Sequence, residues 1–189
     1  MNAAVVAPQR DDNGRVRDLV ERAQQGDRAA LEELYLLHFD RIYSYLHMSV
    51  GSRHDAEDLT TQTFVKMLEA IGRFQWRAVP FSAWLFRIAH NLAMDHFRAS
   101  RRWQPEEEIL ENARGEETSA EDQALASLGD TSMLELIERL SPEQRQVLTL
   151  KFVFRFSNGE AASILGKTEG AVKSLQHRAL VSLQKHVSR

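Results

Sequence analysis

The stretch NGEAASILGKTEGAVKSLQHRALVSL, residues 158–183, decides the fold of the C-terminal part of the chain. Its periodicity predicts a short helix, a tight turn at Gly166 and a longer helix that Thr168 can cap. The candidates for burial in the longer helix are Ala171, Val172, Leu175, Ala179, Leu183 and Val187, and the candidates for its outer face are Lys173, Ser174, Gln176, His177 and Arg178. This pattern is typical of a helix-turn-helix, whose second helix can lie in the DNA major groove, although an ordinary helical hairpin has the same periodicity.

Composition limits the class of protein. Hydrophobic residues make up 43% of the 189 positions, which is enough for a folded interior. The absence of cysteine excludes disulfides and cysteine-ligated metal clusters, and it suits a reducing cytoplasm. No apolar run approaches the roughly 20 residues that span a bilayer, and the N-terminus lacks the pattern of a secretory signal. We therefore expect a cytoplasmic protein with no membrane contact of its own.

Charge is distributed unevenly, although the net charge is only −3. Residues 15–103 carry 13 basic and 11 acidic side chains, and residues 131–189 carry nine basic and five acidic ones. Residues 104–130, between them, carry one basic and nine acidic side chains. Two mildly basic segments therefore flank an acidic one. This regional distribution is compatible with a nucleic-acid partner, and it is more informative about partners than the net charge of the whole chain.

Helical periodicity and helix-breaking residues divide the chain, and no sustained alternation predicts a strand. We expect an all-α protein with two small domains. In the first domain, four helices are separated at Gly26, at residues 49–53 and at residues 72–80, with Asp27 as a helix cap. The predicted parts are a disordered tail at residues 1–14, a four-helix domain at 15–103, a flexible acidic linker at 104–130 and a helix-turn-helix domain at 131–189.

Three motifs in this order resemble an extracytoplasmic-function sigma factor of bacterial RNA polymerase, over nearly the whole chain. The motifs are DAEDLTTQTFVKML at 55–68, similar to region 2.2; FSAWLFRIAHNLAMDHFRASRR at 81–102, similar to regions 2.3 and 2.4; and LSPEQRQVLTLKF at 140–152 followed by ASILGKTEGAVKS at 162–174, similar to region 4. The resemblance implies an alternative sigma factor that binds core RNA polymerase, recognises the −10 and −35 promoter elements and helps to melt the promoter. It implies no catalytic residue, no cofactor and no metal.

The resemblance implies that the helix at residues 55–68 docks on the clamp coiled coil of the polymerase, and that the polymerase flap is also contacted. The matching positions are Asp55, Asp58, Leu59, Gln62 and Thr63. From the residues alone, the same positions are interpreted as a capped, solvated helix N-terminus. His54, Glu57 and Asp58 also lie at metal-ligand spacing, but a third histidine-type ligand is missing.

The resemblance assigns the −10 element to the loop at residues 73–80 and to the helix that follows. There, a base of the non-template strand is unstacked and held in a pocket, where aromatic rings stack and cations contact phosphates. Covering the core is an alternative for Phe74 and Trp76, and for Trp76 the two interpretations are equally favoured. Phe81 and Trp84 are assigned to the core. The implied −10 residues are Arg73, Phe74, Gln75, Trp76, Arg77, Asn91, Asp95, Arg98, Arg101 and Arg102.

The resemblance assigns the −35 element, as duplex, to the helix-turn-helix. The matching positions are Lys167, Thr168, Glu169, Gly170, Lys173, Ser174, His177 and Arg178. The family often has Arg-Leu where this chain has Leu175 and Gln176, so one DNA-facing cation is absent. Gly159 replaces a helix former and weakens its helix by about 1 kcal/mol relative to alanine. Both departures concern the −35 sequence rather than the docking mode.

Further partners and other function classes remain open. The resemblance implies an anti-sigma factor that clamps both domains, and a linker that threads towards the polymerase cleft as a phosphate mimic; a solubilising tether is the alternative. A stand-alone helix-turn-helix regulator would bind duplex DNA tightly without polymerase. An enzyme is not expected, because the seven histidines are scattered and no nucleophile elbow, phosphate-binding glycine loop or HExxH motif occurs.

Overall fold

The structure, a computed structural model, describes residues 13–76, 79–99 and 140–187, and it is helical without strands over these ranges. The all-α prediction is confirmed there. The predicted linker at 104–130 and residues 1–12 of the predicted tail at 1–14 lie outside the described residues, whereas Asn13 and Gly14, predicted as part of the disordered tail, instead begin the first helix. The elements are α1 (Asn13–Gln24), α2 (Arg28–Val50), α3 (Arg53–Ala70), the 3-10 turn η2 (Ile71–Arg73), α4 (Phe81–Ala99), α7 (Pro142–Leu148), the π-helical turn η3 (Thr149–Val153), α8 (Asn158–Leu165) and α9 (Glu169–Val187).

Local capping chemistry sets the ends of the first helices. Asp27 is the predicted N-cap of α2, and its side chain accepts hydrogen bonds from the backbone N–H groups of Ala29 and Ala30. Gly51 ends α2 in the left-handed conformation, with φ of 75°, and Ser52 caps α3. The turn is therefore narrower than the predicted 49–53, because these two residues complete it.

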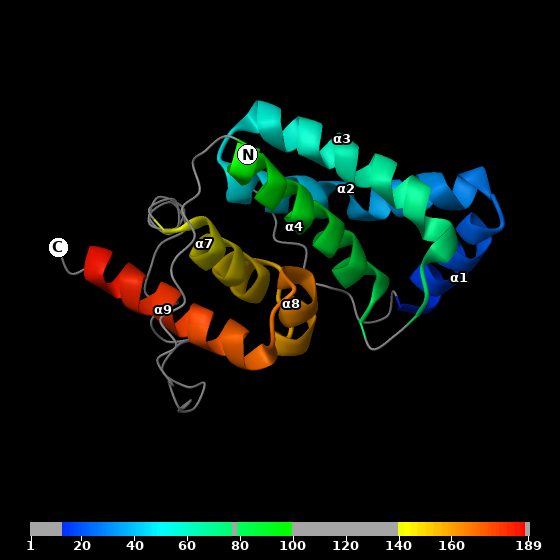
Figure 1. The fold of residues 1–189 in the computed structure, drawn as a ribbon. Coiled ribbons are helices and arrows are strands. Elements are labelled where there is room, and N and C mark those ends of the chain that lie inside the picture. The colour runs from blue at the N-terminus through cyan, green and yellow to red at the C-terminus, as the bar shows by residue number, and fades with distance from the viewer. Residues whose placement is uncertain (1–12, 77–78, 100–139, 188–189) are drawn as a thin grey trace.

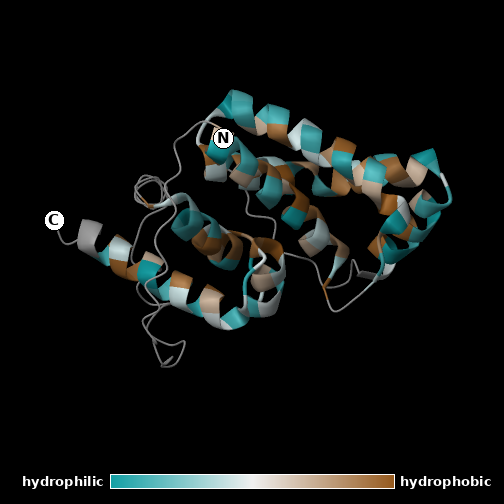
Figure 2. Cartoon of the chain, viewed as in Figure 1, coloured by the Kyte–Doolittle hydropathy of each residue, from teal (hydrophilic) through white to brown (hydrophobic). Residues whose placement is uncertain are grey.

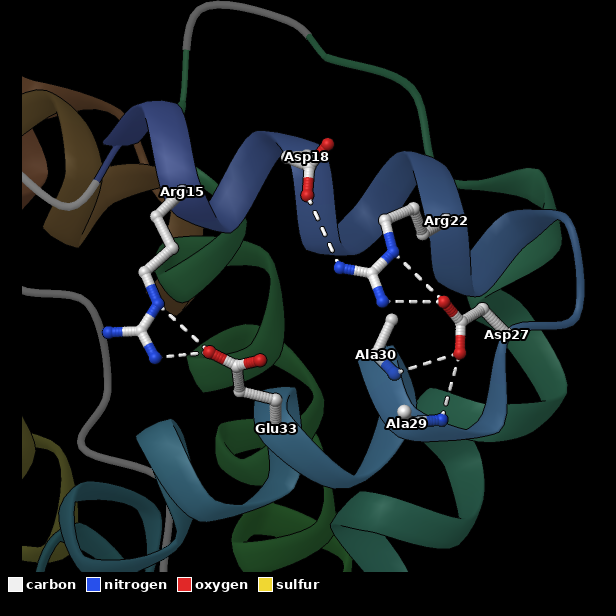
Figure 3. A network of polar contacts seen from close by, with 7 residues as sticks. All are labelled: Arg15, Asp18, Arg22, Asp27, Ala29, Ala30 and Glu33. Carbon is white, nitrogen blue, oxygen red and sulfur yellow. Dashed lines mark hydrogen bonds and ion pairs between the residues drawn. The ribbon is translucent and has the colours of Figure 1, made fainter.

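Polar contacts attach α1 to the start of α2 (Figure 3). Arg22 donates to Asp27 with both Nε (2.9 Å) and Nη2 (2.6 Å), and Arg15 pairs with Glu33. The Arg22 guanidinium, followed by the N–H of Ala30, lowers the pKa of the Asp27 carboxyl. The cap of α2 is thus also its link to α1.

The first core lies between α1, α2, α3 and α4, which pack on one another. Hydrophobic and hydrophilic residues alternate along each helix (Figure 2), as expected for helices that bury one side. Tyr45 and Phe86 are fully buried. Tyr35 and Leu68 are 40% and 52% exposed, because the faces of α2 and α3 that carry them are not covered within the described residues.

Among the C-terminal helices, the predicted turn at Gly166 and cap at Thr168 are confirmed. Gly166 has φ of 66°, and Thr168 Oγ1 accepts from the N–H of Ala171 at 3.2 Å. Ser141, ahead of Pro142, likewise accepts from the N–H of Gln144. After Leu148 the chain continues as the π-helical turn η3, which ends at Val153.

Two positions of α9 differ from the prediction. Gln176 is buried and Ala171 is exposed, so the outer face does not include Gln176. Val172, Leu175, Ala179 and Leu183 are buried as predicted, and the side chain of Val187 lies outside the described ones. A Cβ at position 159 would lie 3.0 Å from Oε1 of Glu169, which is the end of an exposed, flexible side chain that can move aside, so the contact does not require glycine.

The two groups of helices contact each other, with α8 packed against α4 (Figure 1). Aromatic rings fill this contact: the Phe154 centroid lies 6.0 Å from that of Tyr45 and 5.1 Å from that of Phe86, and the Phe156 centroid lies 4.9 Å from that of Phe86. Arg41 Cζ lies 5.5 to 5.9 Å from the centroids of Phe86, Phe154 and Phe156, which are cation–π distances. Arg145 Nη1 also donates to the carbonyl oxygen of Ser49 at 3.2 Å.

Arg155 has a backbone conformation that favours glycine, with φ of 58°. A non-glycine residue in the left-handed conformation destabilises the folded state by about 1 kcal/mol. Glycine removes this cost, but it also has more conformational entropy in the unfolded state, so only part of that free energy is gained. We expect Arg155→Gly to raise the free energy of unfolding by about 0.5 kcal/mol, measured by urea denaturation. The reciprocal change Gly166→Ala meets no atom within 4 Å but has φ of 66°, so it should lower stability. A loss of stability in Arg155→Gly would contradict the prediction.

Two buried histidines predict a pH dependence of stability. Burial, together with Arg41 for His38 and Lys167 for His90, lowers the pKa of each imidazole to about 4. An unfolded histidine has a pKa of about 6.5, so the folded protein binds fewer protons and loses stability as pH falls from about 6.5 to about 4. Urea denaturation should show a loss of about 2 kcal/mol per histidine between pH 7 and pH 5.

A matched variant isolates one of these histidines. The ring of His38 lies 5.5 Å from that of Phe81, so Phe at position 38 keeps an aromatic contact and removes the titrating group. His38→Phe should therefore have a shallower loss of stability between pH 7 and pH 5. An unchanged slope would rule His38 out as a source of the pH dependence.

Within the described ranges, none of the helices combines the length and the apolar content needed to cross a membrane.

Candidate nucleic-acid interface

A cavity of about 560 Å³ lies where the end of α3, η2 and α4 meet. Four of its lining residues, Trp84, Ile88, Asn91 and Asp95, follow one another along one face of α4, because their spacings are three or four residues. Its lining is completed by Lys66, Glu69, Ala70, Arg73 and Leu92. The predicted −10 residues Arg73, Asn91 and Asp95 are thus brought together around one hollow.

The chemistry of this cavity suits an unpaired base. Trp84, Ile88 and Leu92 provide an aromatic ring and apolar surface, and Asn91 is an exposed amide. Arg73 and Lys66 place cations on the same lining, where they can attract phosphates. Asp95 accepts from Arg98 Nη1 at 2.8 Å, so these two predicted residues form an ion pair beside the cavity. Rings with cations around them are the common means of holding single-stranded nucleic acid.

The aromatic loop is placed differently from the sequence interpretation. Phe74 is only 9% exposed, and its ring centroid lies 5.2 Å from that of Trp76 and 5.0 Å from that of Trp84. Its ring therefore fills the core and is not a stacking face for a base. Trp76 is half-buried against Phe74, and Gln75 is exposed. The predicted residues Arg77, Arg101 and Arg102 lie outside the described ranges.

Trp84 lines the cavity, although the sequence assigned it to the core. Phe81, assigned to the core as well, is buried there. Helical spacing offered a way to find Trp84, because it lies seven residues before Asn91 on the same face of α4. Lys66 was also missed, and it carries no comparable sequence signal because its place depends on how α3 packs on α4.

The second predicted surface is the N-terminal half of α9. Lys173, His177 and Arg178 are exposed there, and Ser174 is half-buried between them. Thr168, Glu169 and Gly170 are exposed ahead of them, and Lys167 Nζ lies 3.4 Å from Oε1 of Glu143. The predicted −35 residues are thus all accessible, and they follow one another along the start of one helix.

The predicted polymerase-binding positions on α3 divide into two groups. Asp58 and Gln62 are exposed, one turn apart, whereas Leu59 and Thr63 are buried and Thr63 Oγ1 donates to the Leu59 carbonyl at 2.7 Å. Leu59 and Thr63 therefore pack in the core beneath the surface that Asp58 and Gln62 form. Asp55 Oδ2 lies 3.6 Å from His96 Nε2.

An exposed apolar residue extends the face of Asp58 and Gln62. Val65, three residues after Gln62, is 48% exposed, whereas Leu68, which is 52% exposed, lies about 120° around the helix from Gln62. The sequence motif did not identify Val65 as part of this face.

The possible metal ligands His54, Glu57 and Asp58 are engaged elsewhere or widely spaced. Glu57 accepts from Arg53 at 2.8 Å, and His54 Nε2 lies 3.9 Å from Asp58 Oδ2. Over the described ranges, no three such side chains gather as a metal site would require.

Comparison with known proteins gives matches for both halves. The family Sigma-70 region 2 matches residues 34–103, and the family Sigma-70, region 4 matches residues 131–183. The chain is 42% identical to the ECF RNA polymerase sigma factor BldN of Streptomyces coelicolor, over 91% of this chain and 66% of that protein. It is 33% identical to the ECF RNA polymerase sigma factor SigD of Mycobacterium tuberculosis, over 92% of this chain and 84% of that protein. The solved structure of CnrH in complex with the cytosolic domain of CnrY is also similar, with a TM-score of 0.66 and 26% identity over 91% of this chain and 96% of that one.

Proposed function

The chain belongs to the extracytoplasmic-function sigma factors of bacterial RNA polymerase, and we propose on that premise that it works as an alternative sigma factor. It binds core RNA polymerase, directs it to the −10 and −35 elements of a promoter, and helps to melt the DNA for initiation. The observation that carries this proposal is the presence, in one chain, of a cavity suited to an unpaired base and a separate exposed helix suited to duplex DNA.

The domain that we propose at residues 15–103 holds the −10 element. A base leaving the duplex needs an apolar place to replace its stacking partners and polar groups to identify its edge. Trp84 and Asn91 supply these on one face of α4, and Arg73 supplies positive charge on the opposite lining. Arg98, which pairs with Asp95, lies next to the cavity for contact with the strand that continues from it.

The domain that we propose at residues 131–189 holds the −35 element. Lys173 and Arg178 contact phosphates, which fixes the position of α9 on the duplex, and Ser174 and His177 face base edges in the major groove. Gln176 is buried and so is not available to a base edge, which leaves Ser174 and His177 as the side chains of this part of α9 that can reach one.

Polymerase binding is assigned to the face of α3 that contains Asp58 and Gln62. A polar rim beside exposed apolar side chains is the usual make-up of a protein–protein interface, and Val65 provides the apolar part here. The cavity begins one to two turns further along the same helix, at Lys66 and Glu69, so the proposed polymerase and strand surfaces are neighbours on α3.

An anti-sigma factor is a further proposed partner. The similar structures include CnrH with the cytosolic domain of CnrY, and RpoE of Bartonella quintana with the anti-sigma factor NepR. A partner of this class would cover the polymerase and DNA surfaces until a signal releases the chain. We place the protein with polymerase and DNA in the cytoplasm, and we assign it no covalent step and no cofactor.

Transcription from purified components tests the function. Tagged protein is mixed with core RNA polymerase, the complex is isolated, and run-off transcription is measured on fragmented genomic DNA. We expect a stable complex and transcripts that begin at defined positions only when the protein is present. Tight, sequence-specific binding to duplex DNA without polymerase, with no polymerase complex, would instead favour a stand-alone helix-turn-helix regulator.

A further inference from the structure

The last residue of α1 holds the segment that follows α3. Gln24 Nε2 donates hydrogen bonds to the carbonyl oxygens of Ile71, at 3.0 Å, and Phe74, at 2.8 Å. These two carbonyls flank η2, and the Ile71 oxygen also accepts from the N–H of Phe74 at 3.0 Å. One side-chain amide therefore uses both of its N–H bonds to bridge the two ends of this turn.

A second contact connects α1 to the same segment. Arg17 Cζ lies 5.9 Å from the ring centroid of Trp76, within cation–π range. The helix that makes both contacts is itself fixed, because Leu19 and Val20 are buried and Arg22 is bound to Asp27 (Figure 3). Residues 71–76 are thus held by a rigid neighbour.

This segment contributes to the −10 cavity at a point where regular structure ends. The α-helical pattern of α3 stops at Ala70, η2 makes a single turn, and residues 74–76 have no regular secondary structure. Arg73, in η2, is exposed and lines the cavity. The α-helical hydrogen-bond ladder no longer fixes the backbone at Arg73, so its direction depends on what holds the two ends of the turn: the burial of Ile71 and Phe74, and the hydrogen bonds from Gln24.

We infer that Gln24 is a positioning residue of the −10 site: by bridging the carbonyls of Ile71 and Phe74, it holds Arg73 at the cavity. The inference rests on the proposed function, because it assigns Gln24 a role at the same site. It also extends the site to α1, which lies outside the residues 34–103 that match the region 2 family.

The test uses a variant of the same shape. Gln24→Glu replaces the donating NH2 by an oxygen that faces two carbonyl oxygens, so both hydrogen bonds are lost. Holoenzyme containing this variant should bind a non-template-strand oligonucleotide, taken from a promoter that the wild-type holoenzyme transcribes, about tenfold more weakly. Its affinity for core polymerase should be unchanged. Gln25→Glu makes the same charge change at the next, exposed position and should retain wild-type strand binding.

Two further measurements separate positioning from general loss of stability. Val16→Ala removes buried methyl groups from α1 and leaves Gln24 intact, so it lowers the unfolding temperature without weakening strand binding. In a double-mutant cycle, Gln24→Glu should add little to the loss caused by Arg73→Ala, because Gln24 acts through Arg73. Equal strand-binding losses in Val16→Ala and Gln24→Glu at equal loss of stability, or full additivity with Arg73→Ala, would overturn the inference.

The failure of the inference can be told apart from the failure of the proposed site. If Arg73→Ala and Asn91→Ala weaken strand binding but Gln24→Glu does not, the role of Gln24 is rejected and the −10 cavity stands. If Arg73→Ala and Asn91→Ala leave strand binding at the wild-type level, the cavity is not the −10 site and the inference falls with it.

Discussion

The Asp58→Arg protein is expected to bind core RNA polymerase at least about a hundredfold more weakly than the wild type. Asp58 is exposed on α3, one turn before Gln62, at the centre of the proposed polymerase-binding face. Reversing its charge places a cation where the partner surface is complementary to a carboxylate, and such a reversal costs several kcal/mol at an interface. About 2.8 kcal/mol corresponds to a hundredfold change in affinity. Fluorescence anisotropy of the labelled protein titrated with core polymerase measures the effect.

Glu57→Arg is the matched control. It makes the same change of charge at the preceding exposed residue, which points about 100° away around the helix. Because Asp58 is exposed, its replacement should leave the unfolding temperature of the protein unchanged. Wild-type affinity of the Asp58→Arg protein, or an equal loss in both variants, would remove this face from the polymerase interface.

Asn91→Ala is expected to slow promoter opening by about tenfold to a hundredfold while polymerase binding stays normal. Asn91 is an exposed amide in the cavity lined by Trp84 and Arg73. An amide that pairs with a base edge discriminates by about 1–3 kcal/mol, and this contact would form only once the base has left the duplex. The affinity for closed duplex promoter should therefore change much less than the rate of opening.

Opening can be followed by the fluorescence of 2-aminopurine placed in the −10 element. Gln184→Ala, which removes another exposed helical amide at the far end of α9, is the control and should open the promoter at the wild-type rate. An Asn91→Ala holoenzyme that opens the promoter as fast as the wild type would count against the cavity as the base-binding site.

Local chemistry made much of the fold predictable. Asp27, Ser141 and Gly166 end or begin helices through contacts with residues two to five positions away, so their roles follow from sequence neighbours alone. Helical periodicity likewise identified Val172 and Leu175 as buried. These predictions needed no knowledge of how the helices pack.

The features of the fold and site that the sequence did not predict depend on contacts between residues far apart in the chain. Phe74 is removed from the proposed DNA surface because Phe81 and Trp84 surround it. Gln24 reaches carbonyls 47 and 50 residues further along the chain, a contact with no periodic signal. The residue types of Leu59 and Thr63 match the family motif, but only the packing of the helices shows that both are buried beneath the polymerase-binding face and are not part of its surface.

The Arg41 cluster with Phe154 and Phe156 limits how far the molecule can reach. Elements named −10 and −35 lie about 25 base pairs apart, or about 85 Å along B-form DNA. Two groups of helices that are packed against each other cannot contact both elements at once. The 40 residues from 100 to 139 are long enough to connect sites that far apart, at about 3.3 Å per residue. Simultaneous contact of the two proposed DNA-binding surfaces with both elements therefore requires the contacts of Arg41 with Phe154 and Phe156 to separate. The free energy of those contacts is then a cost that binding to polymerase and promoter has to offset.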